Sequence, residues 1–141
     1  MSPNIKDTHG FKPHHLGISI ANLDASIKWY EDMLGFKLEK RMDVEPLKAK
    51  IAFMNNGSFR IELFEVRDAK PLPAERRQPN TDIGTHGVKH LAWEVKNVTS
   101  LMNELKKKGV DVAMDVSRME GREMAFIRDN SGNMIEILEA W

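Results

Sequence analysis

The sequence contains no cysteine, and this absence narrows the chemistry open to the protein. It excludes disulfide bonds, thiolate zinc sites and a cysteine nucleophile. Any metal centre in this chain must therefore use nitrogen and oxygen ligands. A soft ion such as Cu(I), which prefers sulfur, is disfavoured for the same reason.

The chain also lacks a surplus of charge of either sign. Its 141 residues include 21 Lys and Arg and 21 Asp and Glu, which gives a formal net charge of +0. A protein without a long-range electrostatic field is not drawn to nucleic acid or to an anionic membrane surface. The composition therefore argues against both as partners.

Long apolar runs are missing as well. The first seven residues, Met-Ser-Pro-Asn-Ile-Lys-Asp, are polar and do not resemble a signal peptide. No later stretch approaches the length of an apolar helix that spans a bilayer. We therefore expect a cytoplasmic protein.

What the sequence does contain is a repeat. The segment His-Leu-Gly-Ile-Ser-Ile-Ala-Asn-Leu from His15 resembles His-Leu-Ala-Trp-Glu-Val-Lys-Asn-Val from His90. Each copy closes on a similar string, Ile-Glu-Leu-Phe-Glu around Glu62 and Ile-Glu-Ile-Leu-Glu around Glu136. The separation from histidine to glutamate is 62 − 15 = 47 residues in one copy and 136 − 90 = 46 in the other. Histidine and glutamate are poor core residues, so packing alone does not explain why both recur.

The two copies predict the same order of secondary structure. Alternating apolar and polar residues predict strands, and helical spacing predicts one helix per copy. The first helix has Asp24 as its predicted N-cap and ends at Gly35. We expect strands at about residues 15–21, 36–42, 48–54, 59–66, 88–96, 110–116, 123–128 and 134–139. Each copy is thus a β-α-β-β-β module. We divide the chain into a flexible N-terminal arm (1–13), a first module (14–66), a linker or lid that offers little for packing (67–87), and a second module (88–141).

The repeated polar residues predict one metal site. Strand alternation places His15 on one face of its strand and the apolar Leu16, Ile18 and Ile20 on the other face. In the same way, Glu62, His90 and Glu136 lie on the strand faces that their apolar neighbours do not occupy. The neighbouring His14 is the alternative ligand, although alternation puts it on the other face. Two imidazoles and two carboxylates suit one divalent ion, either Zn, Ni, Co, Mn or Fe(II), and leave room for a bidentate oxygen substrate on an octahedral ion.

With these residues the chain resembles the vicinal oxygen chelate superfamily, which includes glyoxalase I, methylmalonyl-CoA epimerase, extradiol dioxygenases and antibiotic resistance proteins. The resemblance covers residues 14–140 and extends to Asp129-Asn-Ser-Gly-Asn before the last strand. It implies an α+β fold in which two tandem β-α-β-β-β modules form a curved mixed sheet around a metal-binding cavity. That cavity forms within one chain or by exchange of modules in a homodimer.

Glyoxalase I and the epimerases are the branches that this pattern resembles most. The resemblance implies an isomerase or lyase that moves a proton next to a carbonyl of a small carbonyl or hydroxy-acid substrate. It implies Glu136 as the catalytic base and Glu62 as its symmetric counterpart. The alternatives are an Fe(II)-dependent extradiol-type dioxygenase and a non-catalytic ligand-binding protein of the antibiotic resistance type.

The sequence departs from these branches where they recognise their substrates. Ser19 stands where glutathione-dependent glyoxalase I carries an arginine, and Arg128-Asp-Asn stands where epimerases often carry His-Pro-Lys. The use of glutathione or CoA is therefore left open. Arg60 and Arg122 are candidates for holding a substrate carboxylate or phosphate, with a surface ion pair as the alternative for each.

Overall fold

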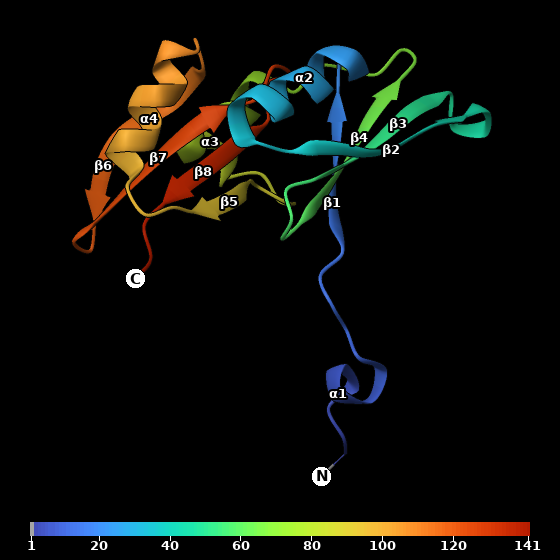
Figure 1. Ribbon diagram of the computed structural model, residues 1–141, viewed down its shortest axis with the longest axis horizontal. Helices are drawn as coiled ribbons and strands as arrows, with labels where there is room; N and C mark the ends of the chain where they lie inside the picture. Colours follow the sequence, from blue (N-terminus) through green and yellow to red (C-terminus); the bar gives the residue numbers. More distant parts are fainter. Residues whose placement is uncertain (1) are drawn as a thin grey trace.

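The computed structural model describes residues 2–141 and shows two four-stranded mixed sheets with helices packed against them (Figure 1). The first module consists of β1 (His15–Ile20), α2 (Leu23–Leu34), β2 (Lys37–Val44), the short helix η1 (Glu45–Leu47), β3 (Ala49–Asn55) and β4 (Arg60–Val66). The second consists of β5 (Leu91–Glu94), α4 (Val98–Lys107), β6 (Asp111–Met119), β7 (Arg122–Arg128) and β8 (Met134–Leu138). The predicted order β-α-β-β-β is confirmed in both.

The two sheets share one topology. Their strand orders are β1-β4-β3-β2 and β5-β8-β7-β6, with the first strand of each module parallel to the last and the other neighbours antiparallel. The register repeats as well, because Gly17 lies opposite Glu62 in the first sheet and Ala92 lies opposite Glu136 in the second. Each of these partners stands two residues after its histidine, so the repeat in the sequence is also a repeat in space.

Asparagine begins both main helices. Asn22 and Asn97 are the N-caps of α2 and α4, and each side-chain oxygen accepts a hydrogen bond from the backbone N–H three residues later, at 2.9 and 2.8 Å. The prediction of Asp24 as the cap was wrong by two residues. Asp24 lies instead in the first turn of α2, where its carboxylate forms an ion pair with Arg41.

One apolar core joins the two modules. Leu23, Ile27 and Tyr30 of α2 belong to the same buried cluster as Met102 and Leu105 of α4. A module of about 50 residues buries a small share of its surface and is only marginally stable alone, so a shared core stabilises both halves.

The turn after β7 connects the modules through polar contacts. We call residues 129–133 the Asp129 turn. The Tyr30 hydroxyl donates to Asp129 Oδ2 at 2.8 Å, and the Ser26 hydroxyl donates to Asn130 Oδ1 at 3.0 Å. The backbone N–H of Ala21 donates to the Ser131 hydroxyl at 2.9 Å. Burial, together with the Asp129 charge and hydrogen bond, raises the pKa of Tyr30 well above its usual value.

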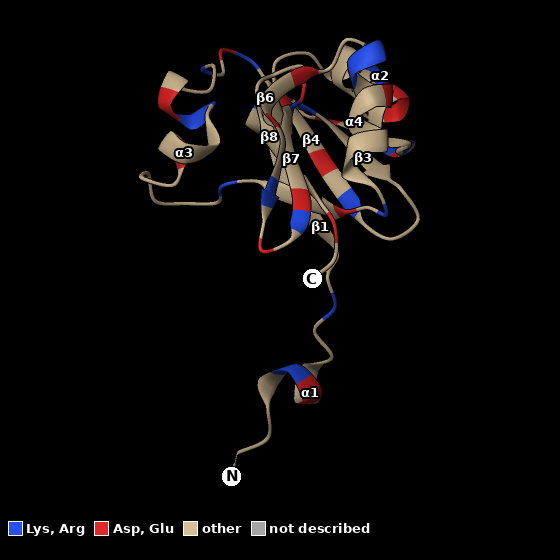
Figure 2. Ribbon diagram, turned by 90° about the vertical axis from the view of Figure 1, so that its left-hand side faces the viewer, with Lys and Arg blue, Asp and Glu red and all other residues tan. Residues whose placement is uncertain are grey.

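The segment between the modules is more ordered than its sequence predicts. It contains the short helices η2 (Ala74–Arg76) and α3 (Pro79–Asp82), and Figure 2 shows α3 to one side of the sheets. The sequence predicts little packing here, and one side chain of the segment, Asp82, is nevertheless only 1% exposed. Its carboxylate binds Arg76 and Lys89, which supplies the partners that a buried charge needs.

Residues 2–13 project away from the two sheets (Figures 1 and 2). They contain the five-residue helix α1 (Ile5–His9), which has no buried residue. None of the helices within residues 2–141 is long and apolar enough to cross a membrane.

Candidate metal centre

His15 and Glu62 form a close pair on two neighbouring strands of the first sheet. His15 opens β1, and Glu62 lies in the middle of β4, opposite Gly17. The distance from His15 Nε2 to Glu62 Oε2 is 3.0 Å. The side chains are 35% and 16% exposed, so the pair is reached from solvent while the apolar side of β1 faces the core.

His90 and Glu136 form the same pair in the second sheet. His90 directly precedes β5, and Glu136 lies in the middle of β8, opposite Ala92. The distance from His90 Nε2 to Glu136 Oε2 is again 3.0 Å, with side chains that are 26% and 17% exposed. The two modules therefore present the same donor atoms at the same separation.

A phenylalanine stands beside each histidine. The ring of Phe53 meets His15 edge to face at a centroid distance of 5.3 Å, and Phe126 meets His90 in the same way at 5.0 Å. Each phenylalanine lies on the third strand of its module, directly opposite the glutamate. These contacts restrict the rotation of both imidazoles. These two phenylalanines were not predicted as site residues from the sequence. The predicted pairing of neighbouring strands could have placed them opposite the glutamates.

The second nitrogen of His15 has a partner of its own. His14 Nδ1 lies 2.7 Å from His15 Nδ1, so one of these nitrogens carries the shared proton and the other accepts it. Such a contact fixes the tautomer of a metal-ligating histidine. Of the two neighbours, it is His15 that faces Glu62.

The two pairs do not converge within one chain. Among residues 2–141, no group of three or more His, Asp or Glu side chains lies close enough together to hold one ion. The sequence predicts a single four-ligand site, whereas the structure places the ligands in two separate pairs. Each pair is half of the predicted set.

The geometry of each pair fits two ligands of one divalent ion. Donors about 2.1 Å from a metal and about 90° apart are separated by about 3.0 Å, which is the distance observed in both pairs. Without an ion, the same distance is that of an imidazole N–H donating to a carboxylate. An ion would thus take the place of the proton that joins each pair.

The residues predicted to touch substrate have different surroundings. Ser19 is exposed on β1, and its carbonyl oxygen accepts a hydrogen bond from Asn133. Arg60 forms a two-pronged ion pair with Glu39 at 2.8 and 3.2 Å, and the Arg60 hydrogen bond holds the pKa of Glu39 below its usual value. Arg122 stacks on the ring of Trp141, with its guanidinium carbon 3.8 Å from the ring centre.

A cavity of about 610 Å³ opens between the two modules. Its walls come from β1, from residues 69–73 and from the beginnings of β5 and β8, and they include Ser19 and His90. A volume of this size is typical of sites for small molecules. The cavity therefore joins one histidine of the candidate metal centre to the segment between the modules.

Comparison with known proteins places the chain in a family. Residues 12–137 match the Glyoxalase/Bleomycin resistance protein/Dioxygenase superfamily, and the chain belongs to this superfamily. It is 23% identical to the mitochondrial methylmalonyl-CoA epimerase of Mus musculus over 131 residues, which cover 90% of this chain and 72% of that one. It is 26% identical to lactoylglutathione lyase GLX1 of Arabidopsis thaliana over 89% of this chain and 43% of the lyase, so it spans less than half of that protein.

A solved structure gives the same result for the fold. The trypanothione-dependent glyoxalase I of Leishmania major superimposes with a TM-score of 0.71 at 27% sequence identity, over 92% of this chain and 86% of that one. The predicted family and the predicted modular α+β fold are thus confirmed.

Proposed function

We propose that this protein is a divalent-metal-dependent isomerase or lyase of glyoxalase I or epimerase type. The observation that carries the proposal is the duplicated His–Glu pair, with the same strands, the same register and the same 3.0 Å separation in both modules. Its relatives include an epimerase and a lactoylglutathione lyase, which supports this choice within the superfamily.

A second copy of the chain would complete the site in this proposal. Each chain offers one pair in each module, and the two pairs are separate. In a two-fold symmetric dimer, the His15–Glu62 pair of one copy could face the His90–Glu136 pair of the other. Such a dimer would contain two complete sites, each with two imidazoles and two carboxylates.

The proposed chemistry is proton transfer next to a carbonyl. A bound divalent ion would supply Lewis acidity at the carbonyl oxygen of the substrate. We assign Glu136 as the base that removes the α-proton, with Glu62 as its counterpart in the other half of the site. Both carboxylates are only 16–17% exposed, so little water competes for their oxygens. His15 and His90, held by Phe53 and Phe126, keep the donor atoms in place.

The experiment combines metal analysis with proton exchange. Elemental analysis of the purified protein should find a divalent ion, and small α-hydroxy or α-keto carbonyl compounds should lose an α-deuteron to solvent only in its presence. The Glu136→Gln variant should keep more of its metal binding than of its α-deuteron exchange. The reason is that an amide oxygen can still act as a metal ligand but cannot act as a base. Glu104→Gln, an exposed change on α4, is the matched control and should behave as wild type.

Three outcomes would overturn this proposal. A protein that binds no divalent ion would remove the metal centre. Metal binding without exchange or turnover across a broad carbonyl panel would argue for a ligand-binding protein instead. Oxygen uptake that requires Fe(II) and is lost with Ni or Zn would point to a ring-cleaving dioxygenase.

A further inference from the structure

The cavity between the modules is lined by charges of one sign. Lys70, Arg76 and Lys89 are its charged lining residues, and neither Asp nor Glu is among the described residues that form its walls. The chain as a whole carries equal numbers of acidic and basic residues. The cavity is thus locally electropositive in a protein without net charge.

The Arg76 guanidinium is fixed by two hydrogen bonds, and one of its nitrogens remains available to a ligand. Its Nε donates to Asp82 Oδ1 at 2.9 Å and its Nη2 donates to the Val88 carbonyl at 2.6 Å. Its Nη1 has no hydrogen-bond partner within residues 2–141, and the side chain is 30% exposed. A guanidinium that is fixed by two contacts loses little entropy when it binds an anion with its remaining N–H groups.

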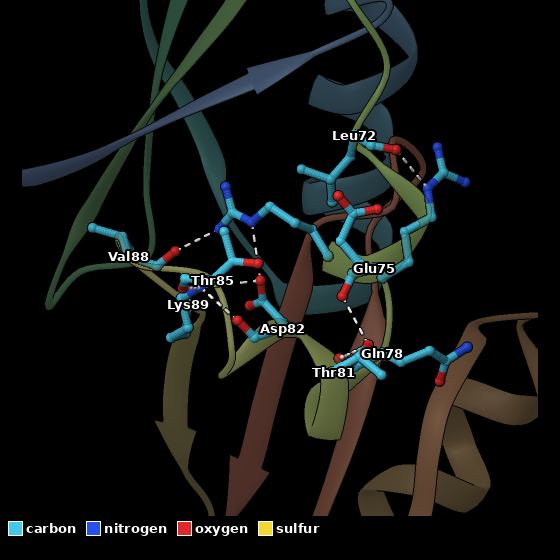
Figure 3. A network of polar contacts seen from close by, with 10 residues as sticks. Leu72, Glu75, Gln78, Thr81, Asp82, Thr85, Val88 and Lys89 are labelled. Atoms are coloured by element: carbon cyan, nitrogen blue, oxygen red, sulfur yellow. Dashed lines mark hydrogen bonds and ion pairs between the residues drawn. The ribbon is translucent and has the colours of Figure 1, made fainter.

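Lys89 adds a fixed positive charge beside it. Its ammonium group donates to the Asp82 carbonyl at 2.7 Å, to Asp82 Oδ1 at 3.2 Å and to the Thr85 carbonyl (Figure 3). One carboxylate therefore balances two cations, and the Arg76–Asp82–Lys89 cluster has a net charge of +1. Lys70 contributes a further charge and forms no ion pair with the described part of the chain.

The remaining walls of the cavity are largely apolar. They include Ile18 and Ile20 of β1, Leu72 of the linker, and Met134 of β8. Apolar walls that include cationic side chains suit a ligand that has an apolar body and one anionic group. A neutral ligand of the same shape would leave this nitrogen of Arg76 without a partner.

We propose that this cavity binds a small organic anion, either a carboxylate or a phosphate ester, with its charge at Arg76 and Lys70. His90 belongs to the same wall, so the uncharged end of the ligand would extend toward the candidate metal centre. The anionic group would then be the part of the substrate that the cavity recognises, an assignment that rests on the function proposed above. Binding to the cavity itself does not require a metal.

The test uses three probes of similar shape on the full-length protein after treatment with EDTA. Benzoate and phenyl phosphate each carry an anionic group on an apolar ring, and benzamide is the neutral analogue of benzoate. Calorimetry should show binding of at least one anion, weakened by added salt, and no comparable binding of benzamide. Amide NMR shifts should locate the bound anion at Ser19 and residues 88–91. The anion that binds more tightly shows whether the cavity prefers a carboxylate or a phosphate ester.

Two variants and a control test the assigned residues. Arg76→Gln should weaken anion binding about tenfold or more, and Lys70→Gln about two- to fivefold, since its charge is exposed. Lys107→Gln removes the same charge from the exposed end of α4 and should leave affinity unchanged. Arg76 also contacts Asp82, so circular dichroism must show that its variant is folded. If it is not, Lys70→Gln alone decides the test.

The inference is overturned if no anion binds, if benzamide binds as well as benzoate, or if affinity is the same in the Lys70 and Arg76 variants as in the wild type. These failures are distinct from failure of the proposed function. A protein that holds a metal and catalyses exchange but binds neither anion would remove only the anion site. A protein that binds benzoate in the cavity but never a metal would remove only the metal-dependent function.

Discussion

The Tyr30 hydroxyl donates a 2.8 Å hydrogen bond to Asp129, joining the first helix of one module to the last turn of the other across 99 residues of sequence. Both side chains are buried, so neither can exchange this partner for water. The contact makes the folding of the two modules interdependent, and it gives the protein a defined response to alkaline pH.

We predict that Tyr30 stays protonated until the protein unfolds in alkali. Its folded-state pKa is raised above the usual value of 10.0, so the folded protein holds the proton more tightly than the unfolded chain. This contribution to stability is complete below pH 10 and is lost as the pH rises further. Tyr30 is the single tyrosine, so tyrosinate absorbance reports it directly and should rise together with loss of circular dichroism.

Tyr30→Phe is the matched variant for this titration. It should lower the free energy of unfolding at neutral pH by about 1.5–3 kcal/mol, the typical loss of a hydrogen bond to a charged group. Its unfolding free energy should also fall less steeply above pH 10 than that of the wild type. Tyrosinate that forms near pH 10 in a folded wild-type protein would contradict the prediction.

Asp82→Asn should destabilise the protein by about 2 kcal/mol at neutral pH, because Arg76 and Lys89 lose their shared counter-charge. Burial acts to raise the pKa of Asp82, and hydrogen bonds from the two cations outweigh it, so that pKa lies below its usual 3.8. The stabilisation is therefore present above pH 3.8 and lost as the pH falls through the lowered value. Urea unfolding at several pH values should show the gap between variant and wild type closing in acid. Glu75→Gln, an exposed change on η2, should cost nothing measurable.

Gly17 and Phe64 should be energetically coupled. A Cβ at Gly17 would lie 3.1 Å from the Phe64 ring, and the matching positions of the second module hold Ala92 and Leu138. Gly17→Ala should therefore be better tolerated when Phe64→Leu is also present. A double-mutant cycle on the free energy of unfolding should give a coupling of about 0.5 kcal/mol or more. Additive effects would show that the ring moves away without cost.

Mixing two defective variants tests whether a second copy completes the metal site. In the proposed dimer, His15→Ala and His90→Ala each spoil both sites. A mixed dimer would combine the intact His15–Glu62 pair of one chain with the intact His90–Glu136 pair of the other. Refolding the two variants together should restore up to one site per mixed dimer, measured as bound metal and as α-deuteron exchange. If each site forms within one chain, mixing restores nothing.

Local patterns predicted the two modules well. Strand alternation at His15 and His90 predicted which faces are exposed, and Gly35 correctly predicted the end of α2. The N-cap was missed by two residues because Asn22 and Asp24 both have side chains that suit a cap, and only the path of the chain decides between them.

Contacts between distant segments were beyond the reach of these patterns. The sequence around Asp82 does not predict its ion pairs with Arg76 and Lys89. The sequence around Arg60 likewise does not predict its ion pair with Glu39. The repeat also says which face of each sheet carries the His–Glu pair, but not how the two sheets lie relative to each other. That relation is set by the shared core and the Asp129 turn.

The contact between Tyr30 and Asp129 has no counterpart on the other side of the repeat. The two N-caps, Asn22 of α2 and Asn97 of α4, are 75 residues apart. At the same separation, Leu105 of α4 occupies the position that matches Tyr30 of α2. Asn55, 74 residues before Asp129, donates to Glu39 instead. The two halves are therefore similar in shape but not exchangeable. A substitution at Asp129 therefore disturbs both modules at once, because its carboxylate accepts hydrogen bonds from Tyr30 and from the backbone of its own turn. A change in either His–Glu pair alters contacts within one module.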